Sequence, residues 1–196
     1  MPLVPAQIAA SIISASSFPG GPTWPLTAQA IGRAISIWGT SNPANLAMAG
    51  ITTGSAGAGT VLGSLTIPPN PSLVVSAFAA NGMVGPTSLP IANAVAIGVS
   101  SSVTSTGLYT GVSVGVSSGG DVSSVVLANS VTLQAVLFTE MVSSYGGSGT
   151  STALMAKALA EGISLLFLSG SGIGAVAPTG PVGPAPASGT SLSVVT

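Results

Sequence analysis

Charged residues are almost missing from this sequence. The 196 residues include 2 basic and 3 acidic side chains, or 3% of positions, whereas an ordinary soluble domain has about 25%. Surface charge keeps a free protein dissolved and apart from its neighbours, and an uncharged surface favours association. We therefore expect other subunits to cover much of this surface.

The residue types that are absent exclude several kinds of chemistry. Histidine and cysteine do not occur, so the chain has no Ser-His-Asp relay, no disulfide and no conventional zinc site. The carboxylates are Asp121, Glu140 and Glu161, and nothing in their placement marks the paired carboxylates of a glycosidase. We expect no enzyme activity, no cofactor, no metal and no small-molecule substrate.

Binding to nucleic acid is excluded by the shortage of positive charge. Arg33 and Lys157 are the only basic residues, and neutralising several phosphates requires a cluster. The glycine-rich stretches at 54–59 and 170–174 lack the Gly-Lys-Ser/Thr ending of a P-loop. Lys157 and Glu161 are four residues apart, which predicts an ion pair within one helix rather than a catalytic lysine.

The apolar character of the chain raises the question of a membrane protein, since its mean hydropathy is +0.77. Residues 34–120 carry no charge, but prolines and many Ser, Thr, Asn and Gly residues interrupt them. A spanning helix needs about 20 mostly apolar residues, and the best candidate, 153–177, contains two charges. We expect no membrane span. The N-terminal segment lacks a basic n-region, so we also expect no secretory signal.

One pattern occurs three times in the chain. AQAIGRAIS at 28–36, ANAVAIGVS at 92–100 and AKALAEGIS at 156–164 follow one another at intervals of 64 residues. The same register aligns Gly21 with Gly85 and Gly149, and Val61 with Val125. We interpret the chain as three repeats, at 1–64, 65–128 and 129–176. A Pro/Gly-rich tail follows at 177–196, which we expect to be extended, or disordered in isolation.

Each repeat is predicted to form an αα-hairpin. The first helices are expected at residues 6–17, 72–81 and 133–144, and they end at the glycine turns FPGG, NGMVG and YGGSG. The second helices are expected to open with a hydroxyl that caps free backbone N–H groups. The residues that carry these hydroxyls are Thr23, Thr87 and Ser151.

Ribbons rich in Gly, Ser, Thr and Val separate the predicted hairpins, at residues 49–67 and 109–127. VSVGV at 112–116 alternates as a strand does, which favours two short strands around a glycine turn; a plain linker is the alternative. The third repeat has no such ribbon. The sequence therefore predicts a mainly α fold with short β ribbons: three tandem αα-hairpin repeats of about 64 residues joined by strands or linkers.

The second helices supply the candidate interface residues. Small residues recur three or four positions apart, which lets another backbone approach closely, and a helix that is apolar on every side is a buried one. Other subunits are the expected neighbours, and packing within one chain is the alternative. The candidate residues are Trp24, Ala30, Ala34, Trp38, Ala94, Gly98, Ala158 and Gly162.

A proline near the start, the AIG helices, Gly-Pro turns and Gly/Ser/Val ribbons together resemble small virion structural proteins of tailed bacteriophages, of the tail, baseplate or neck type. The resemblance implies a non-enzymatic subunit in the virion, assembled in the host cytoplasm. Its partners would be copies of itself and other structural proteins, and three similar units could occupy three similar environments. Two alternatives stay open: a membrane-associated helical-hairpin protein, and a capsid-associated or other surface structural protein.

Overall fold

The computed structural model describes residues 3–16, 21–42, 45–115, 118–146 and 149–195. Two helices followed by two strands occur three times along this part of the chain. The helices are α1 (Pro5–Ser14), α2 (Trp24–Ser41), α3 (Pro71–Ala80), α4 (Ser88–Thr106), α5 (Ser130–Tyr145) and α6 (Thr150–Leu168). The strands are β1 (Leu46–Ser55), β2 (Ala58–Thr66), β3 (Leu108–Val114), β4 (Ser118–Ala128), β5 (Ser171–Pro178) and β6 (Pro186–Val195).

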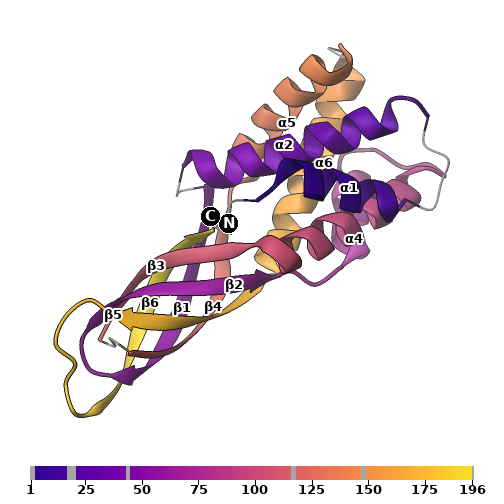
Figure 1. The fold of residues 1–196 in the computed structure, drawn as a ribbon. Helices are drawn as coiled ribbons and strands as arrows, with labels where there is room; N and C mark the ends of the chain where they lie inside the picture. The colour runs from indigo at the N-terminus through magenta and orange to yellow at the C-terminus, as the bar shows by residue number, and fades with distance from the viewer. Residues whose placement is uncertain (1–2, 17–20, 43–44, 116–117, 147–148, 196) are drawn as a thin grey trace.

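The predicted mainly α fold of tandem αα-hairpin repeats is wrong. About 31% of the protein is strand, and the six described strands close into one antiparallel barrel. The helices gather at one end of that barrel, so the molecule is elongated (Figure 1). Residues 28–36, 92–100 and 156–164 do lie within helices α2, α4 and α6. The strands were underestimated because each is only half-buried and rich in glycine and serine.

The order of strands in the barrel explains why no unit forms a sheet alone. The ring runs β1-β4-β5-β2-β3-β6 and closes on itself. The two strands of one unit, such as β1 and β2, therefore stand on opposite sides of the ring, and each strand pairs only with strands of the other two units. The barrel requires all three units at once, and closure leaves no exposed strand edge.

The registers of these pairs repeat with an approximate threefold symmetry. On the first strands, the central glycines Gly50, Gly111 and Gly174 lie opposite Ser123, Ser193 and Gly63, respectively. A methyl group on any of the three would collide with the carbonyl oxygen of Val122, Leu192 or Leu62, in the same order. Glycine at the three positions is what lets the strands approach closely enough to close a narrow barrel.

The tail at 177–196, expected to be extended without a structural partner, belongs to the barrel. It contains the end of β5 and the whole of β6, and β6 pairs with both β1 and β3. The third unit therefore has its ribbon, which the sequence reading did not recognise. Its two strands are joined by residues 179–185, a longer connection than in the other units, which projects beyond the barrel (Figure 1).

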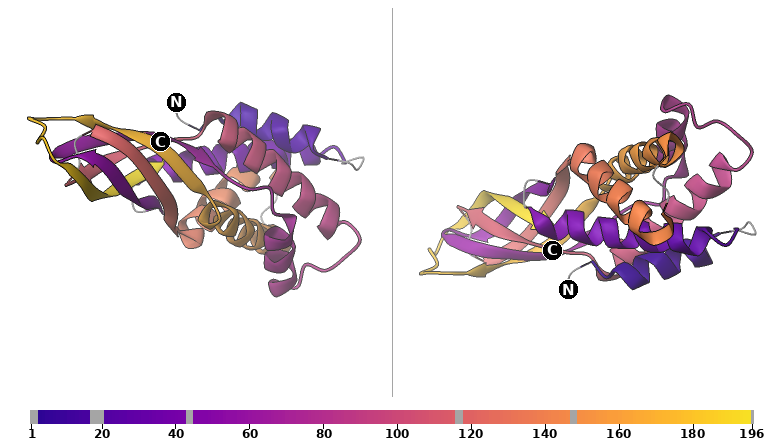
Figure 2. Two further views of the ribbon diagram at one scale, coloured as in Figure 1. Left: turned by 90° about the horizontal axis from the view of Figure 1, so that it is seen from below. Right: turned by 90° about the horizontal axis from the view of Figure 1, so that it is seen from above.

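The helical layer follows the same cyclic plan. α1 packs on α2 and α4, α3 packs on α4 and α6, and α5 packs on α6 and α2. Each first helix therefore joins its own unit to the next one. The glycines of the inner helices allow this close approach, because a methyl group at Gly32 would collide with α1 and one at Gly98 would collide with Ile12. The two views of Figure 2 show these helices beyond one end of the barrel.

A buried tryptophan fixes the helical layer to the barrel. The Trp38 side chain is fully buried and meets the ring of Phe167 edge-on, with centroids 5.4 Å apart. Its indole N–H donates to the carbonyl of Asn129 at 3.0 Å, while Asn45 donates to the Trp38 carbonyl at 2.9 Å. Both asparagines lie where chains pass between helix and strand, so the two layers form one body.

The predicted helix caps are only partly correct. Thr23 and Thr87 do precede α2 and α4 at the N-cap position, but neither side chain caps its helix, and α6 begins after Gly149 rather than at Ser151. The FPGG turn lies mostly outside the described residues, as does part of YGGSG. The NGMVG turn does end α3, with Gly82 at a φ of 73°.

Candidate interaction surface

The strands of the barrel alternate between inward and outward residues, and the outward residues include large aliphatic side chains. β2 alternates strictly between exposed and buried positions over its whole length. Every strand places one large aliphatic residue on the outside. These six exposed residues, which we call the outer band, are Ile51, Leu62, Val112, Val122, Ile173 and Leu192.

The outer band surrounds the barrel rather than marking one side. Val122 is paired directly with Ile51 on one neighbouring strand and with Ile173 on the other, and Val112 is paired with Leu192. Leu62, Val122 and Leu192 occupy equivalent positions in the three units, each beside a central glycine. Their exposures are 57%, 64% and 63%. The same kind of apolar surface therefore appears three times around the circumference.

The described outer wall of the barrel carries no charged side chain. Of the five charged residues, Arg33 and Glu140 lie on α2 and α5, and Lys157 and Glu161 lie on α6. The fifth, Asp121, points into the barrel and is fully buried. The molecule is thus divided into a helical layer that holds all of its exposed charge and a barrel with an apolar, uncharged wall. Large exposed apolar patches mark interaction sites.

The interior of the barrel is more polar than its exterior. Asp121 accepts hydrogen bonds at 2.6 Å from the hydroxyls of Tyr109, Ser123 and Ser191. These residues come from three strands, β3, β4 and β6, so the buried carboxylate joins all three units. Burial of the phenol, together with its hydrogen bond to Asp121, raises the pKa of Tyr109 above its ordinary value. Both carboxylate oxygens are occupied by internal donors, so the arrangement stabilises the barrel.

Tyr109 also fills space for the whole interior. Methyl groups at Gly63, Gly172 and Gly174 would all meet its ring or hydroxyl. The equivalent position of the first unit holds Met48, and that of the third unit holds Gly172. One large side chain and several glycines thus replace three medium side chains, which is how an approximately symmetric barrel is filled without voids.

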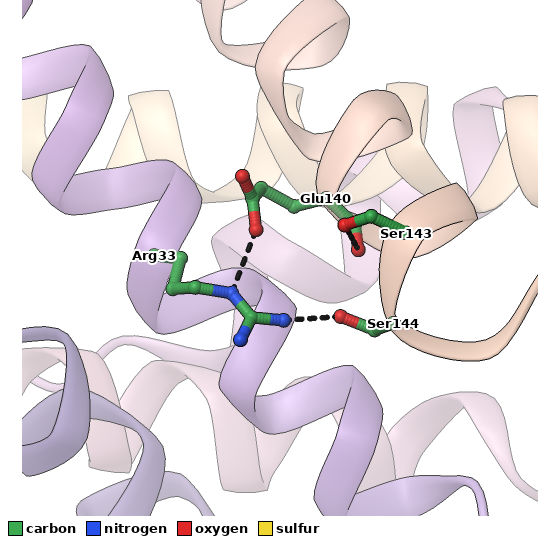
Figure 3. A network of polar contacts seen from close by, with 4 residues as sticks. All are labelled: Arg33, Glu140, Ser143 and Ser144. Atoms are coloured by element: carbon green, nitrogen blue, oxygen red, sulfur yellow. Dashed lines mark hydrogen bonds and ion pairs between the residues drawn. The ribbon is translucent and has the colours of Figure 1, made fainter.

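The exposed charges of the helical layer are engaged with one another. Arg33 of α2 donates from Nε to Glu140 of α5 at 2.7 Å and from its other end to Ser144 (Figure 3). Ser143 lies beside them and donates to the backbone carbonyl of Glu140. The predicted ion pair between Lys157 and Glu161 is confirmed, with 3.9 Å between Nζ and Oε1. Glu161 also accepts from Asn81 at 2.5 Å.

These polar contacts tie neighbouring units together, since α2 with α5 and α6 with α3 belong to different units. Among the described residues no group of three metal-ligating side chains occurs, and each of the three carboxylates has an intramolecular partner. The arrangement provides cohesion between units. Screened pairs of this kind contribute about 1 kcal/mol or less.

The candidate interface residues of the second helices lie inside the protein. Seven of the eight are buried by other elements of the same chain: Ala30, Ala34, Trp38, Ala94, Gly98, Ala158 and Gly162. Trp24 is half-buried and donates from its indole to Ser16 at 2.8 Å. The surface that remains open to a partner is therefore the outer band, which the sequence reading did not single out.

A signal for the outer band does exist in the sequence. The segments GTVLGS (59–64), GGDVSS (119–124) and GTSLSV (189–194) share a large aliphatic residue between small ones. They are spaced by 60 and then 70 residues, because the connections between strands differ in length. The register of 64 that aligns the helices hides them, and its match of Val61 with Val125 is not the one the barrel uses.

One helix in the described part of the chain, α6, is long and apolar enough to cross a membrane by length and composition. Half of its apolar window is buried within the protein, where it packs against α3 and α5. The same properties characterise a core helix of a folded protein.

Comparison with known proteins finds no similar chain: no protein-family model, curated protein or solved structure matches.

Proposed function

We propose that this chain is a non-enzymatic structural subunit of a large symmetric assembly, of the kind that forms the tail or baseplate of a bacteriophage virion. The observation that carries the proposal is the outer band, an uncharged aliphatic surface around a barrel whose interior is polar. Water leaves such a surface poorly solvated, and other subunits would cover it. The small number of charges and the sequence style support the same class of protein.

The barrel wall suits contact with protein better than contact with lipid, the other apolar environment to consider. Outward hydroxyl residues flank the outer band; on β2, Thr60 and Ser64 lie on either side of Leu62. Residues four apart on a strand are separated by about 13 Å, whereas the hydrocarbon core of a bilayer is about 30 Å thick. A bilayer would bury these hydroxyls without partners, at a cost of several kcal/mol in total.

The mass of the native particle tests the proposal. We expect light scattering and electron microscopy, both without detergent, to show a large particle of regular symmetry that contains this chain. The variant Val122→Lys places a charge in the outer band and should lower incorporation into the particle at least tenfold. Ile97→Lys, at an exposed position of α4, is the matched control and should incorporate normally. A wild-type chain that is isolated only as a monomer of 18.6 kDa would refute the proposal.

A further inference from the structure

We infer that the partner covering the outer band is a ring of three or six identical protein subunits, which encircles the barrel as a collar. The inference rests on the proposed function and adds the symmetry and the surface chemistry of the neighbour. It begins from the three equivalent residues Leu62, Val122 and Leu192, which present large aliphatic side chains at three matching places around the circumference.

The closed barrel restricts how a partner can bind to it. All six described strands are paired on both sides, so a partner has no free edge to which it could add a strand. Contact must therefore be made by side chains against the outer wall. Because that wall has no charge in its described part, while the exposed charges belong to the helical layer, the facing surface must be uncharged and aliphatic as well.

The size of the wall argues for encirclement. Six strands about 4.8 Å apart and about 30 Å long give an outer wall on the order of 900 Å², close to the roughly 800 Å² that each partner buries in a stable interface. A second copy of this chain, seated on one side, would cover about a third of the wall, on the order of 300 Å². It would leave most of the outer band in water, whereas a collar covers all of it.

The symmetry of the wall sets the symmetry of the collar. A ring with threefold or sixfold symmetry places the same surface against Leu62, Val122 and Leu192, and the approximate threefold order of the barrel lets one copy of this chain satisfy all three contacts. The structure of the wall thus predicts one copy of this chain for every three or six copies of the collar subunit.

Site-specific photo-crosslinking tests this inference. A benzoylphenylalanine residue is placed at position 62, 122 or 192, one variant at a time, in the full-length chain. The native particle is purified without detergent and irradiated, and the crosslinked peptides are sequenced. We expect all three positions to crosslink to the same peptide of one partner polypeptide. Native mass spectrometry should give a ratio of one to three or one to six. A probe at Ile97 on α4 reports on the helical layer and should yield a different peptide or none.

Three results would overturn the collar. The three positions could crosslink to different peptides, they could crosslink to a second copy of this chain, or the chain could float with phosphatidylcholine vesicles in place of a protein partner. The mass of the particle separates this failure from that of the proposed function. A large particle with unlike crosslinks refutes only the collar, and a lone monomer without crosslinks refutes both.

Discussion

At the scale of single residues, glycine determines whether the barrel can close. Gly111 → Ala tests this directly, because the added methyl group would collide with the backbone carbonyl of Leu192. We expect this variant to lower the free energy of unfolding by about 1–3 kcal/mol, the usual cost of overpacking. Gly85 → Ala is the control, since nothing lies within 4 Å of its methyl position. Chemical denaturation of both variants, followed by circular dichroism, measures the difference, and equal stabilities would contradict the close approach.

The hydrogen bond between Tyr109 and Asp121 predicts a dependence of stability on pH. The pKa of the Tyr109 phenol is raised in the folded protein from an ordinary value of 10.0, so the unfolded state loses this proton first as pH rises. The contribution of Tyr109 to stability is therefore complete below pH 10 and declines above it, at about 1.4 kcal/mol per pH unit.

The variant Tyr109→Phe isolates this contribution. At pH 8 it should be less stable than the wild type by about 1–3 kcal/mol, because Asp121 loses one of three donors. Between pH 10 and pH 11 the difference should shrink, since only the wild type loses the contribution of Tyr109. Urea unfolding of both proteins at each pH measures it, with other titrating groups cancelling in the comparison. A difference that stays constant with pH would show that the phenol is not held neutral by the fold.

At the scale of secondary-structure elements, β6 is the strand that closes the barrel. A chain ending at Pro178 lacks β6, so β1 and β3 each lose a partner and expose unpaired N–H and C=O groups. We expect this truncated chain to aggregate or to lose its barrel, as measured by gel filtration and far-ultraviolet circular dichroism. Insertion of a Gly-Ser segment after Gly180 keeps both strands and should be tolerated. A soluble, folded truncated chain would contradict the role of β6.

The positions of the helices could be predicted from the sequence, but the barrel could not. Regular spacing of alanine and glycine places α2, α4 and α6 correctly, because helical periodicity is local. The strands pair only across units, so no local pattern shows which residues meet, and connections of unequal length remove the common spacing. The small residues at Ala30, Ala94 and Ala158 were correctly seen as packing positions, but which helices they face depends on the cyclic order of the layer.

At the scale of the whole molecule, the three units act as one cooperative body. Each first helix bridges to the next unit, each strand pairs with both other units, and Asp121 joins three strands from three units. No unit can bury its apolar surface alone, so we expect the chain to unfold in a single transition. The apolar surface that remains after folding is concentrated in the outer band, which is why assembly rather than catalysis is the function that we propose.

The most direct measurement of that claim is the accessibility of the outer band in the free and the assembled protein. Because the chain contains no cysteine, single cysteines at positions 62, 122 and 192 can be labelled without background, with a cysteine at the exposed position 97 as the control. We expect maleimide to react with all four in the isolated folded chain. In the native particle the three barrel positions should be protected at least tenfold while position 97 still reacts. Equal labelling of the barrel positions in the free and the assembled protein would contradict the account.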